Sequence, residues 1–211
     1  MHTSPSQQIL KTLAPYQGLI FDMDGTLIDS MPGHLAAWEI TAQHYHFPFD
    51  NDWLYSLGGM PGDCIVELIN QKYALQLDPP QVSQFRMETF AQFKNSTNLI
   101  TITNQILNYY YQAKKLAVGT GSPRSHAVPV LKQTGLFNKL DAIATASDVS
   151  KHKPHPDTFL LAAQQMGLEP TSCIVFEDTI LGMEAAHQAG MHCFLLENNE
   201  LILHPNDTPI N

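Results

Sequence analysis

Two aspartates that follow a short apolar run carry the clearest chemical signal in the sequence. Asp22 and Asp24 come directly after the apolar residues 19–21 and are followed by Gly25. Such an apolar run is typical of a strand buried on both faces of a parallel sheet. Side chains two positions apart on an extended chain point the same way, so both carboxylates can face one pocket. Their mutual repulsion predicts a hard cation such as Mg²⁺, which in turn invites a phosphate as a further ligand.

Other polar residues follow later apolar segments at the points where strands should end. Thr120 follows residues 116–118, and the acids Glu177 and Asp178 follow residues 173–176. Lys153 follows a fourth candidate strand at residues 142–144. In an open parallel sheet, ligands bind at the carboxyl ends of the strands, so we expect these side chains to share one site.

The elements that must position these residues divide into two patterns. From residue 100 onward, helical and apolar segments alternate as in repeated βα units. Residues 34–98 instead show apolar positions at helical spacing and no buried-strand run. We predict an α/β fold with a Rossmann-like parallel sheet core, formed by residues 1–30 and 100–211, and an inserted α-helical cap, residues 31–99. Met31, Pro32 and Gly33 should form a hinge, residues 1–17 a tail or a short edge helix outside the core, and residues 197–211 a weakly specified tail.

The composition and charge of the chain limit the kinds of molecule that it is expected to bind. The chain of 211 residues has a net charge of −9 and only 11 Lys and Arg, which argues against binding a nucleic-acid backbone. It has no apolar run long enough to span a membrane and no basic, apolar leader, so we expect a cytoplasmic protein. Cys64, Cys173 and Cys193 lack metal-like spacing and are expected to be reduced. A monomer is the default for a capped domain of this size.

Taken in order, these residues resemble the four motifs of the haloacid dehalogenase superfamily of phosphotransferases. The first motif, DxDxT, matches residues 22–26, and the second, a Ser or Thr after a strand, matches Thr120. The third, a Lys, matches Lys153, and the fourth, a pair of acids, matches Glu177 and Asp178. The helical insertion also resembles the family's mobile cap in its most common position.

The resemblance implies a hydrolysis that passes through an aspartyl-phosphate. Asp22 would be the nucleophile, and Asp24 would protonate the leaving oxygen and later deprotonate the attacking water. Mg²⁺ would take an oxygen of Asp22, the backbone carbonyl of Asp24 and Asp178. Glu177 is expected to support a metal-bound water.

The resemblance also assigns residues to the transferring phosphoryl group. Thr120 and the backbone N–H of Gly121 would donate to its oxygens. Lys153 would offset its negative charge and is preferred over Lys151, which reads as a solvated loop charge. Taken alone, Thr120 would be interpreted as a turn or capping residue.

Several segments are similar to the β-phosphoglucomutase group and especially to its bacterial fructose-1-phosphate phosphatase relatives. Members that act on sugar phosphates place a histidine where His34 stands, so His34 is expected to contact substrate or Asp24. Mutases of the group carry an Arg near Gly62, which has no side chain to bind a second phosphate, and a Lys near Arg86, which could substitute for it. Ser122 or Arg124 could supply such a contact instead.

The sequence therefore predicts a Mg²⁺-dependent phosphatase that hydrolyses small sugar phosphates, with a small phosphomonoester as its partner. A sugar phosphomutase of the β-phosphoglucomutase type is the first alternative. The second is a non-catalytic sugar-phosphate sensor, against which the intact set of catalytic residues argues.

Overall fold

A six-stranded sheet forms the centre of the computed structural model, which describes residues 5–93 and 97–206. The strand order is β3-β2-β1-β4-β5-β6, in which β1 to β5 are parallel and β6 is antiparallel to β5. On β1, Leu19 lies opposite Leu116 and Ile174 on its two neighbours. The strands are β1 (Gly18–Phe21), β2 (Lys115–Gly119), β3 (Ala142–Ala144), β4 (Cys173–Glu177), β5 (His192–Glu197) and β6 (Glu200–His204).

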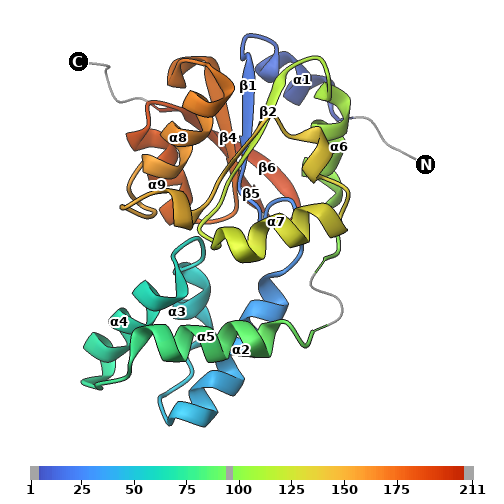
Figure 1. The fold of residues 1–211 in the computed structure, drawn as a ribbon. Helices are drawn as coiled ribbons and strands as arrows, with labels where there is room; N and C mark the ends of the chain where they lie inside the picture. Colours follow the sequence, from blue (N-terminus) through green and yellow to red (C-terminus); the bar gives the residue numbers. More distant parts are fainter. Residues whose placement is uncertain (1–4, 94–96, 207–211) are drawn as a thin grey trace.

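Helices cover both faces of this sheet (Figure 1). Leu19 and Phe21 of β1 pack on one side with the helices α1 (Gln7–Leu13), α6 (Thr101–Tyr110) and α7 (Arg124–Gln133). Ile20 points to the other side, where α8 (Asp157–Met166) and α9 (Ile180–Gln188) lie. This alternation is the period-two pattern of a strand buried on both faces. The α/β fold class with a mostly parallel sheet is confirmed.

A second group of helices lies beyond the carboxyl end of β1 (Figure 1). This helical bundle consists of α2 (Met31–Tyr45), α3 (Asn51–Ser56), α4 (Gly62–Tyr73) and α5 (Pro79–Phe90). It has its own apolar core around Trp38, Ile69 and Val82. Asp50 and Asp78 cap the first turns of α3 and α5, which fixes where these helices begin. The division of the chain at residues 31 and 99 into two domains stays a prediction.

Three local predictions are wrong. Met31, Pro32 and Gly33 form the first turn of α2 rather than a hinge before it, because the first helical turn does not need the N–H that proline lacks. The N-terminal segment is not outside the core, since Leu13 of α1 is fully buried in it.

The third error concerns the C-terminal segment, where residues 200–204 form β6 instead of a tail. Asn198 and Asn199 both adopt positive φ, as a two-residue hairpin turn with β5 requires. Residues 207–211 lie outside the described part of the chain.

The location and assembly predictions are tested only in part. Among the described helices, none combines the length and apolar character that a membrane crossing needs. All three cysteines are free. The cytoplasmic location, the monomeric state and the absence of a nucleic-acid partner stay predictions.

Candidate active site

A buried ion network lies at the carboxyl ends of β1 and β4. Lys153, on the loop before α8, places its Nζ 2.6 Å from Asp22 Oδ1 and 2.6 Å from Glu177 Oε1. All three side chains are buried. Burial lowers the pKa of Lys153, but the charges of Asp22 and Glu177 outweigh it and raise the pKa above its usual value. Lys153 is therefore a fixed positive charge beside Asp22.

Glu177 is held by the protein through both of its oxygens. Oε1 accepts from Lys153, and Oε2 accepts from the backbone N–H groups of Asp178 and Thr179 and from the Thr179 hydroxyl. These contacts indicate that Glu177 holds Lys153 in position. The predicted support of a metal-bound water by Glu177 stays a prediction.

Asp178 offers a carboxylate oxygen for which the described residues supply no partner. Its Oδ1 accepts from Thr26 at 3.2 Å, while its buried Oδ2 has no hydrogen bond. Gly25, with φ +87°, lets this carboxylate approach the loop, because a Cβ there would lie 2.1 Å from Oδ2. Burial, followed by the charges of Glu177 and Asp22, raises the pKa of Asp178 well above its usual range.

The pKa of Asp22 is raised as well, which indicates that the site lacks a positive charge near these two carboxylates. Burial raises the pKa of Asp22, and Glu177 and Asp24 raise it further, against the opposing effect of Lys153. Two buried carboxylates whose ionised forms are disfavoured, one with an unpaired oxygen, are a hard oxygen donor set. Asp22 and Asp178 therefore fit a divalent cation such as Mg²⁺.

Asp24 differs from Asp22 because neutral donors surround its carboxylate. Ser30 donates to Oδ1 and Ser122 donates to Oδ2, each at 2.7 Å, and His34 Nε2 lies 3.3 Å from Oδ1. Burial alone would raise the pKa of Asp24, but the hydrogen bonds that it accepts from His34 and Ser30 lower it. The structure thus holds Asp24 ionised and oriented.

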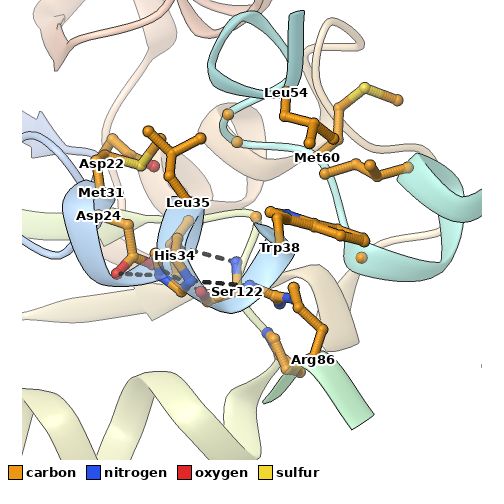
Figure 2. Close-up of a pocket in the computed structure, with 17 residues that line it drawn as sticks. Asp22, Asp24, Met31, His34, Leu35, Trp38, Leu54, Met60, Arg86 and Ser122 are labelled. Atoms are coloured by element: carbon orange, nitrogen blue, oxygen red, sulfur yellow. Dashed lines mark hydrogen bonds and ion pairs between the residues drawn. The ribbon is translucent and has the colours of Figure 1, made fainter. Parts of the chain in front are cut away.

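His34 links Asp24 to an arginine of the helical bundle (Figure 2). Its Nδ1 lies 2.8 Å from Arg86 Nη1, and its ring stacks on Phe90 with centroids 3.8 Å apart. A guanidinium can only donate, so Nδ1 accepts and Nε2 carries the proton that faces Asp24. Burial lowers the pKa of His34, which agrees with this neutral form.

These side chains border a cavity of about 60 Å³ between the sheet and the helical bundle. The sheet side contributes Asp22, Asp24 and the loop after β2. The bundle side is mainly apolar, with Arg86 at its edge (Figure 2). The two sides touch through glycines, because a Cβ on Gly121 would lie 1.8 Å from the carbonyl oxygen of Gly59. The apolar lining residues are Met31, Leu35, Trp38, Leu54, Met60 and Ile65.

Comparison with known proteins gives this geometry a family. Residues 19–196 match the haloacid dehalogenase-like hydrolases. The chain belongs to this family. Fructose-1-phosphate phosphatase YqaB of Escherichia coli is 38% identical over 177 residues, which cover 83% of this chain and 94% of the relative. A hydrolase from Pseudomonas syringae has a similar structure, with a TM-score of 0.76 and 26% identity, covering 84% of this chain and 83% of that one.

A mutase is also among the relatives. Beta-phosphoglucomutase of Bacillus subtilis is 26% identical over 183 residues, 83% of this chain and 80% of the relative. The predicted family, the similarity to the β-phosphoglucomutase group and the enzyme class, a phosphoric monoester hydrolase, are confirmed.

In this haloacid dehalogenase-like hydrolase, the loop after β2 brings two of its three predicted side chains to the cavity. Thr120 and Ser122 line it, and the Thr120 hydroxyl accepts the Ser122 N–H at 3.0 Å. Arg124 is directed elsewhere: it pairs with Asp148 at 2.7 Å and donates to the Ile143 carbonyl. Arg124 is not among the described residues that line the cavity, because Asp148 holds its guanidinium on the surface.

A cluster that sequence reasoning did not find joins Asp24, His34 and His126, whose potential ligand atoms lie within 4.8 Å of one another. It is not the predicted metal set. Both ring nitrogens of His34 already have partners, Arg86 and Asp24, so we interpret His34 and Asp24 as a hydrogen-bonded pair with the His126 ring beside them. Ser30 was also missed, although its position six residues after Asp24 in a tight loop is a signal that could have been used.

Proposed function

We propose that this hydrolase removes the phosphoryl group from small sugar phosphates, of the fructose-1-phosphate kind, through an aspartyl-phosphate and with Mg²⁺. The observation that carries the proposal is the buried Lys153 that bridges Asp22 and Glu177 beside a cavity that also holds Asp24. A fixed cation next to an oriented carboxylate is suited to phosphoryl transfer, in which positioning and charge stabilisation dominate. The activity that the name of the Escherichia coli relative gives supports the substrate class.

The first step forms a bond between an oxygen of Asp22 and phosphorus and breaks the bond from phosphorus to the alcohol oxygen. Asp24 gives a proton to that oxygen, so a neutral alcohol leaves. We assign the donation to phosphoryl oxygens to the Thr120 hydroxyl and the Gly121 N–H, because both residues line the cavity. In the second step Asp24 takes a proton from water, whose oxygen attacks phosphorus and releases Asp22 and inorganic phosphate.

The surroundings of Asp24 suit both of its tasks. The donors Ser30, Ser122 and His34 favour the ionised form, which is the base needed for the second step. A bound phosphate adds negative charge to the cavity, which raises the pKa of Asp24 toward the protonated form that the first step needs.

The metal proposal rests on Asp22, Asp178 and the backbone carbonyl of Asp24, which would hold the ion. Mg²⁺ supplies positive charge that draws the phosphate to the nucleophile and stabilises the charge that develops on it. The unpaired Oδ2 of Asp178 supports this assignment.

A phosphomutase is the second candidate, since a β-phosphoglucomutase is among the relatives. A mutase must hold a second phosphate while its intermediate turns over. Gly62 supplies no side chain for this, and a Cβ there would lie 2.4 Å from Ser83 Oγ. This crowding favours the phosphatase.

Phosphate release from a panel of sugar phosphates, with and without Mg²⁺, tests the proposal. We expect release to require Mg²⁺ and to fall by ~10⁴-fold or more in Asp22→Asn, because the nucleophile acts as part of a unit. Asp52→Asn, which alters an exposed acid on α3, is the matched control and should behave like wild type. Interconversion of glucose 1- and 6-phosphates with little free phosphate would favour the mutase, and no turnover of any ester would leave the sensor.

A further inference from the structure

His126 is a histidine near Asp24 that the proposed steps do not use. It lies in the first turn of α7, where the next residue, Ala127, is fully buried in the core beside the sheet. One of its ring nitrogens lies within 4.8 Å of a carboxylate oxygen of Asp24 and of a ring nitrogen of His34. Within the described part of the chain, however, its side chain forms no hydrogen bond. The contacts that hold the ring are therefore those of an aromatic side chain.

The His126 ring contacts two aromatic rings of the helical bundle. Its centroid lies 5.5 Å from that of Phe90, with an angle of 74° between the ring planes. It lies 6.2 Å from the centroid of His34, at an angle of 72°. His34 and Phe90 stack on each other with an angle of only 6°. Perpendicular and stacked rings at such distances attract each other beyond the effect of the apolar area that they bury, so His34, Phe90 and His126 form a three-ring cluster.

The three-ring cluster joins the helical bundle to the sheet side. His34 lies on α2 and Phe90 on α5, whereas His126 comes from α7, the sheet-side helix that faces the bundle (Figure 1). Arg86, which bonds His34 Nδ1, also lies on α5, so the contacts of His34 with Arg86 and Phe90 move with the bundle. The distance of 3.3 Å between His34 Nε2 and Asp24 Oδ1 is already long for a hydrogen bond. A small displacement of the bundle would therefore break it.

We propose that His126 is a positioning residue, whose ring holds the stacked rings of His34 and Phe90 against the sheet side and so keeps His34 in hydrogen-bond contact with Asp24. The inference rests on the proposed phosphatase function, because Asp24 is the acid and base of that reaction. The aromatic ring of His126 is what this role requires. A role in proton transfer or in binding a ligand would require its nitrogens instead, so the two kinds of role can be separated by substitution.

Steady-state kinetics on the sugar phosphate that wild type hydrolyses fastest provide the first test. His126→Ala should lower kcat about 10-fold, the size of effect expected from the loss of two aromatic pairs. KM should stay within about threefold of wild type, because His126 is not among the described residues that line the cavity. His126→Phe keeps a ring and removes the nitrogens, and should restore kcat to within about threefold of wild type. A Phe variant as slow as the Ala variant would show that the nitrogens act, and would overturn the inference.

His44→Ala is the matched control. It also removes a histidine ring that contacts a phenylalanine of α5, since His44 stacks on Phe85 with centroids 4.3 Å apart. Both of these rings belong to the bundle, because His44 lies on α2. We therefore expect kcat and KM of this variant to stay within about twofold of wild type. An equal loss of kcat in His44→Ala and His126→Ala would show that the link to the sheet side is not what matters, and would overturn the inference.

NMR signals of the two His34 ring nitrogens give a readout that does not depend on turnover. Because Arg86 donates to Nδ1, wild type should show the single tautomer with its proton on Nε2, and the signals that disappear in His34→Gln identify the ring. In His126→Ala the two signals should shift toward each other, because the ring loses its fixed orientation, whereas His126→Phe and His44→Ala should keep the wild-type pattern.

The NMR measurement also separates failure of this inference from failure of the proposed function. Unchanged His34 signals in His126→Ala would overturn the inference even if kcat falls, and would leave the phosphatase intact. If wild type hydrolyses no phosphomonoester while the His34 signals shift in His126→Ala, the proposed function is wrong and the positioning of His34 by His126 is supported.

Discussion

The cavity has one wall on the sheet side and one on the side of the helical bundle, and different kinds of side chains form them. The sheet wall is a closed ion network in which Asp22, Lys153 and Glu177 are buried and mutually bonded. The bundle wall is mainly apolar, and His34 and Arg86 are the ionisable side chains among its described lining residues. A network that holds the proposed nucleophile, Asp22, beside a fixed charge suits any phosphate ester. A mostly apolar wall with one guanidinium suits a choice between leaving groups.

The two walls also differ in how firmly they are attached. β1 is paired on both sides, so the loop that carries Asp22 starts from the middle of the sheet. The helical bundle has a core of its own and meets the sheet side at the close approach of Gly59 and Gly121. Residues of the bundle can therefore differ between related proteins while the site on the sheet stays the same, so that one reaction can be applied to several substrates.

Removing the cation of the sheet wall should have the largest effect. Lys153→Met leaves Asp22 and Glu177 buried and unpaired, so we expect phosphate release to fall by about 10²–10³-fold. The free energy of unfolding should fall by about 3–5 kcal/mol, because one partner of a buried ion pair is lost.

Lys151→Met is the control for this change, because it removes an exposed lysine from the same loop. It should alter stability by less than about 0.5 kcal/mol. Urea denaturation and phosphate assays measure both variants. Equal effects of the two substitutions would show that the sheet wall is not organised around Lys153.

Disrupting the contact between the two walls should have the second largest effect. Gly121→Ala places a methyl group where the Gly59 carbonyl lies, so the bundle must move away from the sheet. We expect kcat/KM to fall about 100-fold, as small displacements of positioned groups do. Ser125→Ala, at an exposed position just after this loop, should have no effect. A fully active Gly121→Ala protein would mean that the walls need not touch.

Addition of Mg²⁺ should have a smaller effect, an increase in stability that depends on pH. Without Mg²⁺, the raised pKa values of Asp22 and Asp178 mean that the folded protein binds these protons more tightly than the unfolded chain. These groups therefore lower stability as the pH rises, and Mg²⁺ should reverse this. At a 100-fold excess over Kd we expect a gain of about 2.7 kcal/mol, or roughly 5–10 °C in Tm, near pH 8.

The same gain should shrink near about pH 5, because protons compete with Mg²⁺ for the carboxylates. Thermal melts with Mg²⁺ or with a chelator at both pH values measure it. Asp178→Asn should abolish the difference. A gain of equal size at both pH values would contradict the assignment of these residues to the metal.

The smallest effect is expected away from both walls. Arg124 forms an exposed pair with Asp148, so Arg124→Ala should cost less than about 1 kcal/mol of stability and change kcat/KM less than about twofold. Loss of sugar phosphate turnover in this variant would instead support the sequence-based prediction that Arg124 binds substrate.

Much of the sheet wall could be predicted because its signals are local. The apolar run before Asp22 and the acids that end β4 are visible in the sequence, and the parallel order of β1 to β5 brings them together. Lys153 was preferred over Lys151 from its place in a motif, and the structure joins Lys153 to Asp22.

The residue pattern predicts the bundle wall only as helices, and His34, Gly62 and Arg86 were singled out there from the family resemblance. Which side chain of α5 meets His34 depends on how two helices pack, which periodicity does not give. Arg124 shows the same limit, since its partner Asp148 comes from the segment after β3 and no local pattern links them. β6 was missed although residues 201–203 form an apolar run, because the turn at Asn198 and Asn199 that pairs it with β5 was not recognised.

The position of β1 in the sheet also has a consequence for how the molecule acquires activity as it is synthesised. β1 leaves the ribosome early, but its partners β2 and β4 come from the middle and the last third of the chain. Pairings between such distant segments form slowly, whereas all helices of the bundle come from residues 31–90, so their contacts span shorter separations in sequence. We therefore expect the helical bundle to take shape before the ion network at the sheet, so that an unfinished chain has no hydrolytic activity.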